Sequence, residues 1–128
     1  MIALVVMPLE RSEPLLGLLS PYADLLLPCA TCSQAADLLR ACPDLDLVFT
    51  ALTLPDGTWT DVLNSAAYLR PGAPLVVCTR PAPERLRAEV AEAGAFGLLA
   101  EPFEADEVRG LLDRLAGSTS SRRLAAAV

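Results

Sequence analysis

Apolar residues along this chain fall into five short runs, and each run is followed by a segment with helical spacing. The runs at residues 2–6, 47–52 and 75–79 are almost entirely apolar, which is typical of strands buried on both faces of a parallel sheet. A shorter run at 25–27 and the segment at 94–103 supply two more strands. This alternation predicts an α/β domain with a doubly wound, five-stranded parallel sheet, strand order 2-1-3-4-5, and helices on both faces.

The predicted helices are bounded by residues that favour helix ends. Ser12 is the expected N-cap of the first helix, and Ser20-Pro21 ends it because the residue before a proline is disfavoured in helical geometry. Pro28 is expected to close the second strand. The other helices are expected over residues 33–41, 58–69, 83–93 and 105–116.

Length and composition indicate a single soluble domain. The chain has 128 residues, and its composition shifts to Ser, Thr, Arg and Ala near the end. We therefore expect one domain over 1–117 and a tail or linker over 118–128, which either leads to a further domain or forms a short helix. No apolar run reaches the roughly 18 residues of a spanning helix, and no basic region precedes the first run. These features predict a cytoplasmic protein without a membrane partner.

The charged residues exclude several functions. The net charge is −6, and Arg122-Arg123 is the only local basic cluster, so direct binding to nucleic acid is not expected. The chain contains no histidine, the commonest general base and transition-metal ligand. All ten basic residues are arginines, which excludes mechanisms that need a lysine amine from this chain.

Cys29 and Cys32 form a CxxC motif near the expected start of the second helix. A helix N-terminus lowers the pKa of a thiol, so one interpretation is a redox pair, and another is half of a zinc site. No second CxxC or histidine pair completes a zinc site. The favoured interpretation is that these cysteines are small, half-buried residues at a strand-to-helix junction.

Two stretches are similar to a known family. The segment Asp46–Leu63, DLVFTALTLPDGTWTDVL, resembles the centre of response-regulator receiver domains, whose pattern is close to DLVLLDLxLPDGxGxDVL. The segment Gly94–Phe103, GAFGLLAEPF, resembles the same family's GADDYLTKPF. The resemblance covers about residues 2–116 and implies the flavodoxin-like (CheY-like) version of the doubly wound fold.

The resemblance also implies where the family's phosphorylation chemistry should lie. The phosphoacceptor aspartate of receivers falls on Ala51, and their two magnesium-binding acids fall on Met7 and Pro8. None of these side chains has an oxygen that could bind magnesium or attack phosphorus. Glu10 is an alternative, displaced metal ligand, but an acid that favours the helix N-terminus is the preferred interpretation.

The remaining positions of the receiver site are also altered. Thr79 matches the family's hydroxyl residue, and Arg80 stands where a small residue is usual. Glu101 replaces the family's phosphate-binding lysine. Arg80 is expected either to fill the pocket or to form an ion pair with Glu101. By resemblance, the Glu101-Pro102 peptide bond is expected to be cis.

These substitutions predict a degenerate receiver, or pseudo-receiver, that is not an enzyme and needs no cofactor or metal. We expect it to act in a two-component-type pathway by binding a protein: a kinase, an output domain or a second copy of itself. By resemblance, the contact face, and the face of a possible homodimer, is the fourth helix, fifth strand and fifth helix. The candidate interface residues are Trp59, Arg85, Arg87, Leu98, Phe103 and Arg109.

Two other hypotheses stay open at this stage. The first is a flavodoxin-like protein that works by redox chemistry at Cys29 and Cys32 or binds a small ligand in the emptied pocket near Thr79. The second is a true receiver phosphorylated on Asp56 in the loop, although no magnesium ligands are expected around it.

Overall fold

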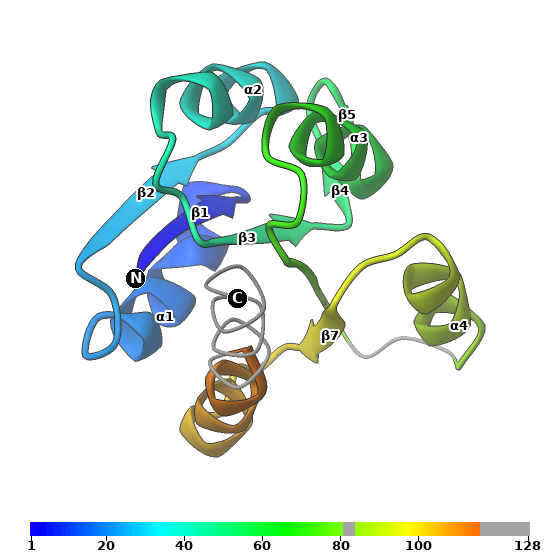
Figure 1. Cartoon of the computed structure of the whole chain (residues 1–128). Coiled ribbons are helices and arrows are strands. Elements are labelled where there is room, and N and C mark those ends of the chain that lie inside the picture. The colour runs from blue at the N-terminus through cyan, green and yellow to red at the C-terminus, as the bar shows by residue number, and fades with distance from the viewer. Residues whose placement is uncertain (81–83, 116–128) are drawn as a thin grey trace, which may run out of the picture.

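The five predicted strands form one parallel sheet in the predicted order (Figure 1). The structure is a computed structural model and describes residues 1–80 and 84–115. The strands of the sheet are β1 (Ile2–Val6), β2 (Leu25–Cys29), β3 (Leu47–Ala51), β6 (Leu75–Thr79) and β7 (Gly97–Ala100). They are arranged β2-β1-β3-β6-β7, and every neighbouring pair is parallel. The flavodoxin-like, CheY-like fold is therefore confirmed.

Helices cover both faces of the sheet. They are α1 (Leu9–Leu19), α2 (Cys32–Ala41), α3 (Trp59–Leu69), α4 (Glu84–Glu92) and a helix over residues 105–115. α2 and α3 lie on one face and α1 and the 105–115 helix on the other, while α4 stands beside β7 (Figure 1). The predicted helix ends at 83 and 116, and the predicted tail over 118–128, lie outside the described residues.

The fully apolar runs occupy the strands that have neighbours on both sides. Every residue of β3 and β6 is buried, and so are four of the five residues of β1. Phe49, on β3, is the largest of the fully buried side chains. Burial of a side chain this size stabilises the folded state by about 1.5–3 kcal/mol relative to exposure. The hydrophobic core is thus centred on the strands that end at the candidate site.

The prediction that Ser12 caps the first helix is wrong. α1 begins at Leu9, and its N-cap is Pro8, four residues before Ser12. The carbonyl oxygen of Pro8 accepts hydrogen bonds from the amides of Arg11 and Ser12, both at 3.0 Å. Ser12 is buried inside the helix, where its hydroxyl donates to the carbonyl of Leu9 at 2.8 Å. A serine hydroxyl can satisfy a carbonyl within a helix as well as cap one, and the sequence does not distinguish the two.

The second strand is also longer than predicted. Pro28 does not close β2, which continues to Cys29, and Pro28 is aligned with Val5 of β1. β2 is an edge strand, so only one of its sides is paired. The backbone nitrogen of Pro28, which has no hydrogen to donate, faces away from β1, so the proline costs the sheet no hydrogen bond. The proline also blunts this exposed edge against pairing with another chain.

A small hairpin follows the central strand. The predicted strand over 47–52 ends at Ala51, and the chain then forms β4 (Thr53–Leu54) and β5 (Gly57–Thr58), which pair antiparallel. Pro55 and Asp56 make the turn between them. The LPDG sequence is therefore a tight hairpin that leads directly into α3.

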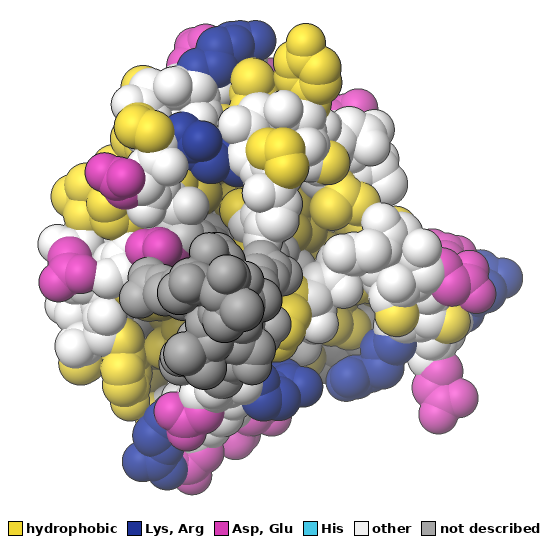
Figure 2. All heavy atoms as spheres, in the orientation of Figure 1, with side chains coloured by type: hydrophobic (Ala, Val, Ile, Leu, Met, Phe, Trp, Pro, Cys, Tyr) yellow, Lys and Arg dark blue, Asp and Glu magenta, His cyan; other side chains and the backbone are white. Residues whose placement is uncertain are grey.

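Charged side chains of both signs gather over α4 and over the 105–115 helix (Figure 2). In residues 1–80 and 84–115, none of the helices combines the length and the apolar character needed to cross a bilayer.

Candidate functional site

The predicted site residues meet at the carboxyl edge of the sheet. Because β1, β3, β6 and β7 are parallel, the residues that end them lie next to one another across the sheet. Ala51 is aligned with Cys78, and Thr79 with Ala100. The fold therefore brings the predicted pocket residues to one edge; they are Met7, Pro8, Ala51, Thr79, Arg80 and Glu101.

The floor of this site is apolar. Met7 and Ala51 are buried, with at most 1% of either residue exposed. Thr79 is also buried, and its carbonyl oxygen accepts a 2.7 Å hydrogen bond from the amide of Glu101. The side chains beneath the site are therefore a thioether, a methyl group and one threonine hydroxyl. Among the described residues, no three Cys, Asp or Glu side chains lie close enough together to hold a metal ion.

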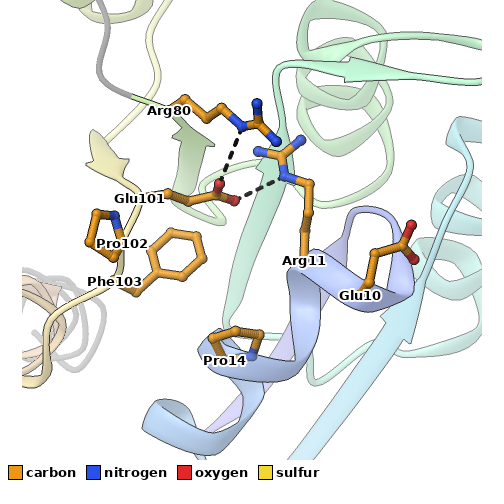
Figure 3. Close-up of a pocket in the computed structure, with 7 residues that line it drawn as sticks. All are labelled: Glu10, Arg11, Pro14, Arg80, Glu101, Pro102 and Phe103. Carbon is orange, nitrogen blue, oxygen red and sulfur yellow. Dashed lines mark hydrogen bonds and ion pairs between the residues drawn. The ribbon is translucent and has the colours of Figure 1, made fainter.

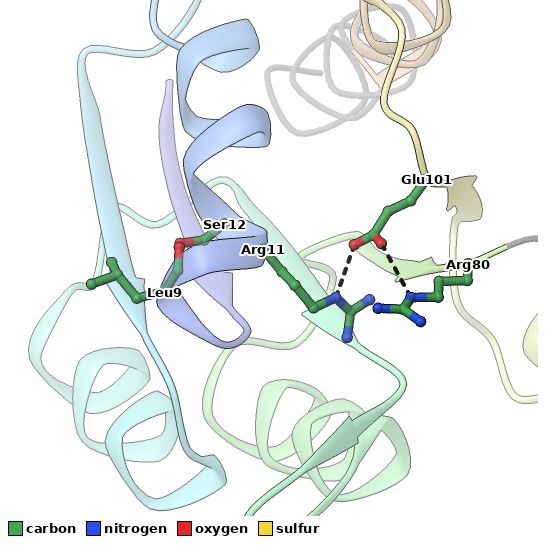
Figure 4. A network of polar contacts seen from close by, with 5 residues as sticks. All are labelled: Leu9, Arg11, Ser12, Arg80 and Glu101. Atoms are coloured by element: carbon green, nitrogen blue, oxygen red, sulfur yellow. Dashed lines mark hydrogen bonds and ion pairs between the residues drawn. The ribbon is translucent and has the colours of Figure 1, made fainter.

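Above this floor, Glu101 binds two arginines. Its Oε1 accepts a 2.9 Å hydrogen bond from Nε of Arg11, in the first turn of α1 (Figure 4). Its Oε2 lies 4.0 Å from Nε of Arg80, which follows β6. The Arg80–Glu101 pairing considered from the sequence is therefore present, but only at long range. The Glu101-Pro102 bond is cis, as predicted.

Sequence reasoning missed Arg11, although it is the closer partner of Glu101. A signal was present: a glutamate in place of a lysine at a half-buried position needs a nearby cation. Predicting the first helix from Ser12 placed Arg11 outside that helix. With α1 starting at Leu9, Arg11 lies in the first turn of the helix and reaches the site.

A surface pocket of about 540 Å³ opens beside these charges. Figure 3 shows Arg11, Arg80 and Glu101 on one side, with Pro102 and Phe103 forming the adjacent wall. The complete lining is Glu10, Arg11, Pro14, Arg80, Glu101, Pro102 and Phe103. The pocket lies between α1 and the segments that follow β6 and β7. Of the six predicted pocket residues, Arg80 and Glu101 line it.

Asp56 is hydrogen-bonded to the start of α2. Its two carboxylate oxygens accept hydrogen bonds from the amides of Cys32, at 2.7 Å, and Ser33, at 3.0 Å, in the first turn of α2. These two bonds, the Cys32 bond first, hold the pKa of Asp56 below its usual value. An acid at a helix N-terminus is favoured by the partial positive charge there. The carboxylate proposed as an alternative phosphorylation site thus caps a helix.

The next residues of the hairpin are arranged just as tightly. Thr58 and Asp61 form a capping box at the start of α3, in which the carboxylate of Asp61 accepts from the amide of Thr58 at 2.9 Å. A Cβ atom placed on Gly57 would lie 2.4 Å from Oδ2 of Asp61 and 3.0 Å from Sγ of Cys32. A larger residue at position 57 would displace the Asp61 carboxylate from its hydrogen bond with Thr58. The hairpin thus contacts the starts of both α2 and α3.

The two cysteines of the CxxC motif are free thiols with poor reactivity. Burial raises the pKa of Cys29 to about 11. Partial burial, followed by the negative charge of Asp56, raises the pKa of Cys32 to about 11. Cys32 is the first residue of α2, where the helix alone would lower its pKa, but the carboxylates of Asp56 and Asp61 reverse that effect. This environment opposes the redox interpretation.

The candidate interface residues divide into three groups by exposure. Trp59 is only 8% exposed and belongs to the hydrophobic core, so its indole is not a surface anchor. Leu98 and Phe103 are half-buried. Arg85 and Arg87 are exposed on α4 and Arg109 on the 105–115 helix, where Arg109 pairs with Asp106 at 2.8 Å.

We expect Asp56→Asn to lower the urea midpoint of unfolding, because the variant loses the charge at the N-terminus of α2. The pKa of Asp56 is lowered in the folded state, so its contribution is complete above the unfolded pKa and disappears as pH falls through the folded value. The difference in urea midpoint between the variant and the wild type should therefore be constant near neutral pH and shrink below about pH 4. Urea unfolding from pH 3 to 7 measures this.

The matched control is Asp113→Asn, which changes an exposed acid on the 105–115 helix. We expect this variant to unfold at nearly the wild-type midpoint. Equal midpoints for the two variants at neutral pH would contradict the capping role of Asp56.

We expect Cys29 and Cys32 to react about a hundredfold more slowly with iodoacetamide in the folded chain at pH 7.5 than in urea, because only the thiolate reacts. The folded rate should keep rising up to about pH 11, where both thiols titrate. Mass spectrometry of tryptic peptides measures each rate. Equal folded and unfolded rates, or a Cys29–Cys32 disulfide formed readily with oxidised glutathione at neutral pH, would restore the redox interpretation.

Comparison with known proteins gives matches among solved structures. No protein-family model matches the chain. No curated protein matches it either. The signal receiver domain of an HD domain-containing protein from Pseudomonas fluorescens Pf-5 matches with TM-score 0.80 and 26% identity, over 95% of this chain and 90% of that one. The non-phosphorylated HemR receiver domain from Leptospira biflexa matches with TM-score 0.75 and 28% identity, over 89% and 92% of the two chains.

More distant structures have the same fold. The chemotaxis response regulator CheY4 of Vibrio cholerae matches with TM-score 0.77 and 16% identity, over 89% of this chain and 97% of that one. The structural neighbours of this chain are thus receiver domains of two-component response regulators, and the chain has their CheY-like fold.

Proposed function

We propose that this chain is a receiver-like signalling module that acts through contact with another protein and does not accept a phosphoryl group. The receiver domains with 26% and 28% identity support a place in two-component-type signalling. The observation that carries the rest of the proposal is the Arg11–Glu101 pair: a carboxylate stands where an aspartyl phosphate would need a cation.

Phosphoryl transfer to a carboxylate needs three things at this edge of the sheet: a nucleophile, a metal ion, and positive charge for the transferred oxygens. Ala51 offers only a methyl group as nucleophile. Met7 and Pro8 offer no oxygen to magnesium, which prefers hard oxygen ligands in octahedral geometry. Glu101 adds negative charge where the phosphoryl oxygens would lie. The nucleophile and the metal ligands are therefore missing, and the charge that the family's lysine supplies is reversed at Glu101.

The proposed contact surface is formed by α4, β7 and the 105–115 helix. A groove of about 410 Å³ runs between them, and charges of both signs surround it (Figure 2). Its charged lining residues are Arg87, Asp106, Glu107 and Arg114. Because both signs are present, the face can complement a second copy of itself as well as a different protein.

We expect no magnesium-dependent change in the amide NMR spectrum when the chain is titrated with beryllofluoride and magnesium together. We also expect no mass increase after incubation with acetyl phosphate. The reason is that the pocket lacks the nucleophile, the metal ligands and the lysine. A matched variant that restores all of them, Met7→Asp, Pro8→Asp, Ala51→Asp and Glu101→Lys, should bind beryllofluoride with magnesium.

Saturable, magnesium-dependent shifts around Thr79 and Asp56 in the wild-type chain would contradict the proposal. Shifts that are equally large without magnesium would report anion binding alone and would leave it standing.

We expect self-association through the α4–β7–105–115 face, measured by sedimentation equilibrium at low salt. Arg87→Glu should weaken the dimer by about tenfold or more, because like charges facing each other across an interface are unfavourable. Arg40→Glu is the matched control, since Arg40 is an exposed, ion-paired arginine on α2, away from this face. A monomer at all concentrations would remove the homodimer and leave a different protein as the partner.

A further inference from the structure

The two arginines that bind Glu101 use only part of their hydrogen-bonding capacity. Arg11 and Arg80 each approach the carboxylate through Nε. Within residues 1–80 and 84–115, no carboxylate or carbonyl accepts a hydrogen bond from their terminal nitrogens. A guanidinium carries five N–H donors in a planar fork, so the two terminal nitrogens of each group have no acceptor among the described residues.

These two guanidinium groups lie side by side. Both close-ups show their terminal nitrogens next to one another, in front of Glu101 (Figures 3 and 4). They come from α1 and from the residue after β6, two separate parts of the chain. The side chain of Arg11 is 26% exposed and that of Arg80 is 83% exposed, so the pair is held on one side and open to solvent on the other.

The charges at this point do not balance. Two guanidinium groups meet one carboxylate, which leaves one positive charge in a chain whose net charge is −6. Glu10 also lines the pocket, but its carboxylate points away from the arginines (Figure 3). Neighbouring like charges favour an anion between them, and paired guanidinium forks fit the oxygens of a carboxylate or a phosphate.

The remaining wall of the pocket is apolar. Pro14, Pro102 and the half-buried ring of Phe103 line the roughly 540 Å³ space next to the arginines. A volume in this range suits a small molecule, and a ring or short chain attached to the anion would lie against Phe103. Bare ions would leave that wall unused.

We propose that this pocket binds a small organic oxyanion, with its carboxylate or phosphate head on Arg11 and Arg80 and its apolar body against Phe103. Binding is reversible and non-covalent and needs no magnesium. The inference does not depend on the proposed signalling function, because it rests on the free nitrogens of two arginines and on the pocket beside them.

The test is an NMR titration of the full chain in EDTA, observing backbone amides and arginine Nε–H groups. Phenyl phosphate, benzoate and inorganic phosphate are the probes. We expect saturable shifts at Arg11, Arg80 and Phe103. Phenyl phosphate should bind about tenfold more tightly than inorganic phosphate, because only the former buries apolar surface against the ring. Comparing benzoate with phenyl phosphate identifies which oxyanion head is preferred.

Two variants separate the head site from the apolar wall. Arg80→Gln should weaken binding of every probe at least fivefold, and its exposed position makes misfolding an improbable cause of the loss. Phe103→Ala should weaken phenyl phosphate but not inorganic phosphate. The control, Arg40→Gln, removes an exposed arginine elsewhere and should bind all probes as the wild type does.

Unsaturable shifts spread over Arg40 and Arg109 as well, or equal affinity in Arg80→Gln and the wild type, would overturn the inference. Failure of these probes leaves the proposed signalling function intact, since that function is tested by beryllofluoride with magnesium. Conversely, magnesium-dependent phosphorylation would contradict the proposed signalling function but would not contradict magnesium-free binding of an oxyanion at Arg11 and Arg80.

Discussion

The carboxylate of Glu101 sets the electrostatic constraint at the carboxyl edge of the sheet. Its side chain is only 20% exposed, so the charge needs a partner, and Arg11 supplies it at 2.9 Å. Exposed ion pairs contribute about 0.2–1 kcal/mol. Breaking a buried pair costs about 3–5 kcal/mol because the remaining charge is left without a partner. The contribution of this half-buried pair to stability lies between those limits and is small compared with that of the hydrophobic core. Its main effect is therefore to fix the position of α1 relative to the loop after β7.

The hairpin after β3 explains why the receiver-like sequence around it does not depend on the residue at position 51. Asp56 caps α2, Asp61 caps α3, and a side chain at Gly57 would push against Asp61 and Cys32. Each of these contacts is structural and none involves the position of Ala51. The motif that produced the resemblance therefore reports how two helices begin, and the reactive position can change independently of it.

The sheet could be predicted from the sequence because its information is local. Buried strands such as β3 and β6 are continuous apolar runs, and short connections with helices between them allow few topologies. Local patterns failed where a residue had two possible partners. Ser12 bonds to a carbonyl inside α1 where a cap was predicted, and Pro28 fits in β2 only because that strand is at the edge.

The site was predicted in part for the same reason. The topology brings the ends of the parallel strands together, so Ala51, Thr79 and Glu101 could be placed at one edge from the resemblance. Arg11 could not, because its role depends on a side-chain contact between residues 90 positions apart. The incorrect prediction that the first helix starts at Ser12 also placed Arg11 outside that helix, so its contact with Glu101 was not anticipated. A charge reversal at a half-buried position is the signal that should prompt a search for such a partner.

The choice of arginine at this edge has a further consequence. A lysine there could lose its proton as its surroundings change, whereas a guanidinium stays charged in proteins. Arg11 and Arg80 therefore place two guanidinium groups at the mouth of the pocket. With no histidine in the chain and no nucleophile at Ala51, neither protonation of an imidazole nor aspartyl phosphorylation at that position can change this charge. On the two proposals above, what changes at this edge is the molecule bound there, a small anion or another protein.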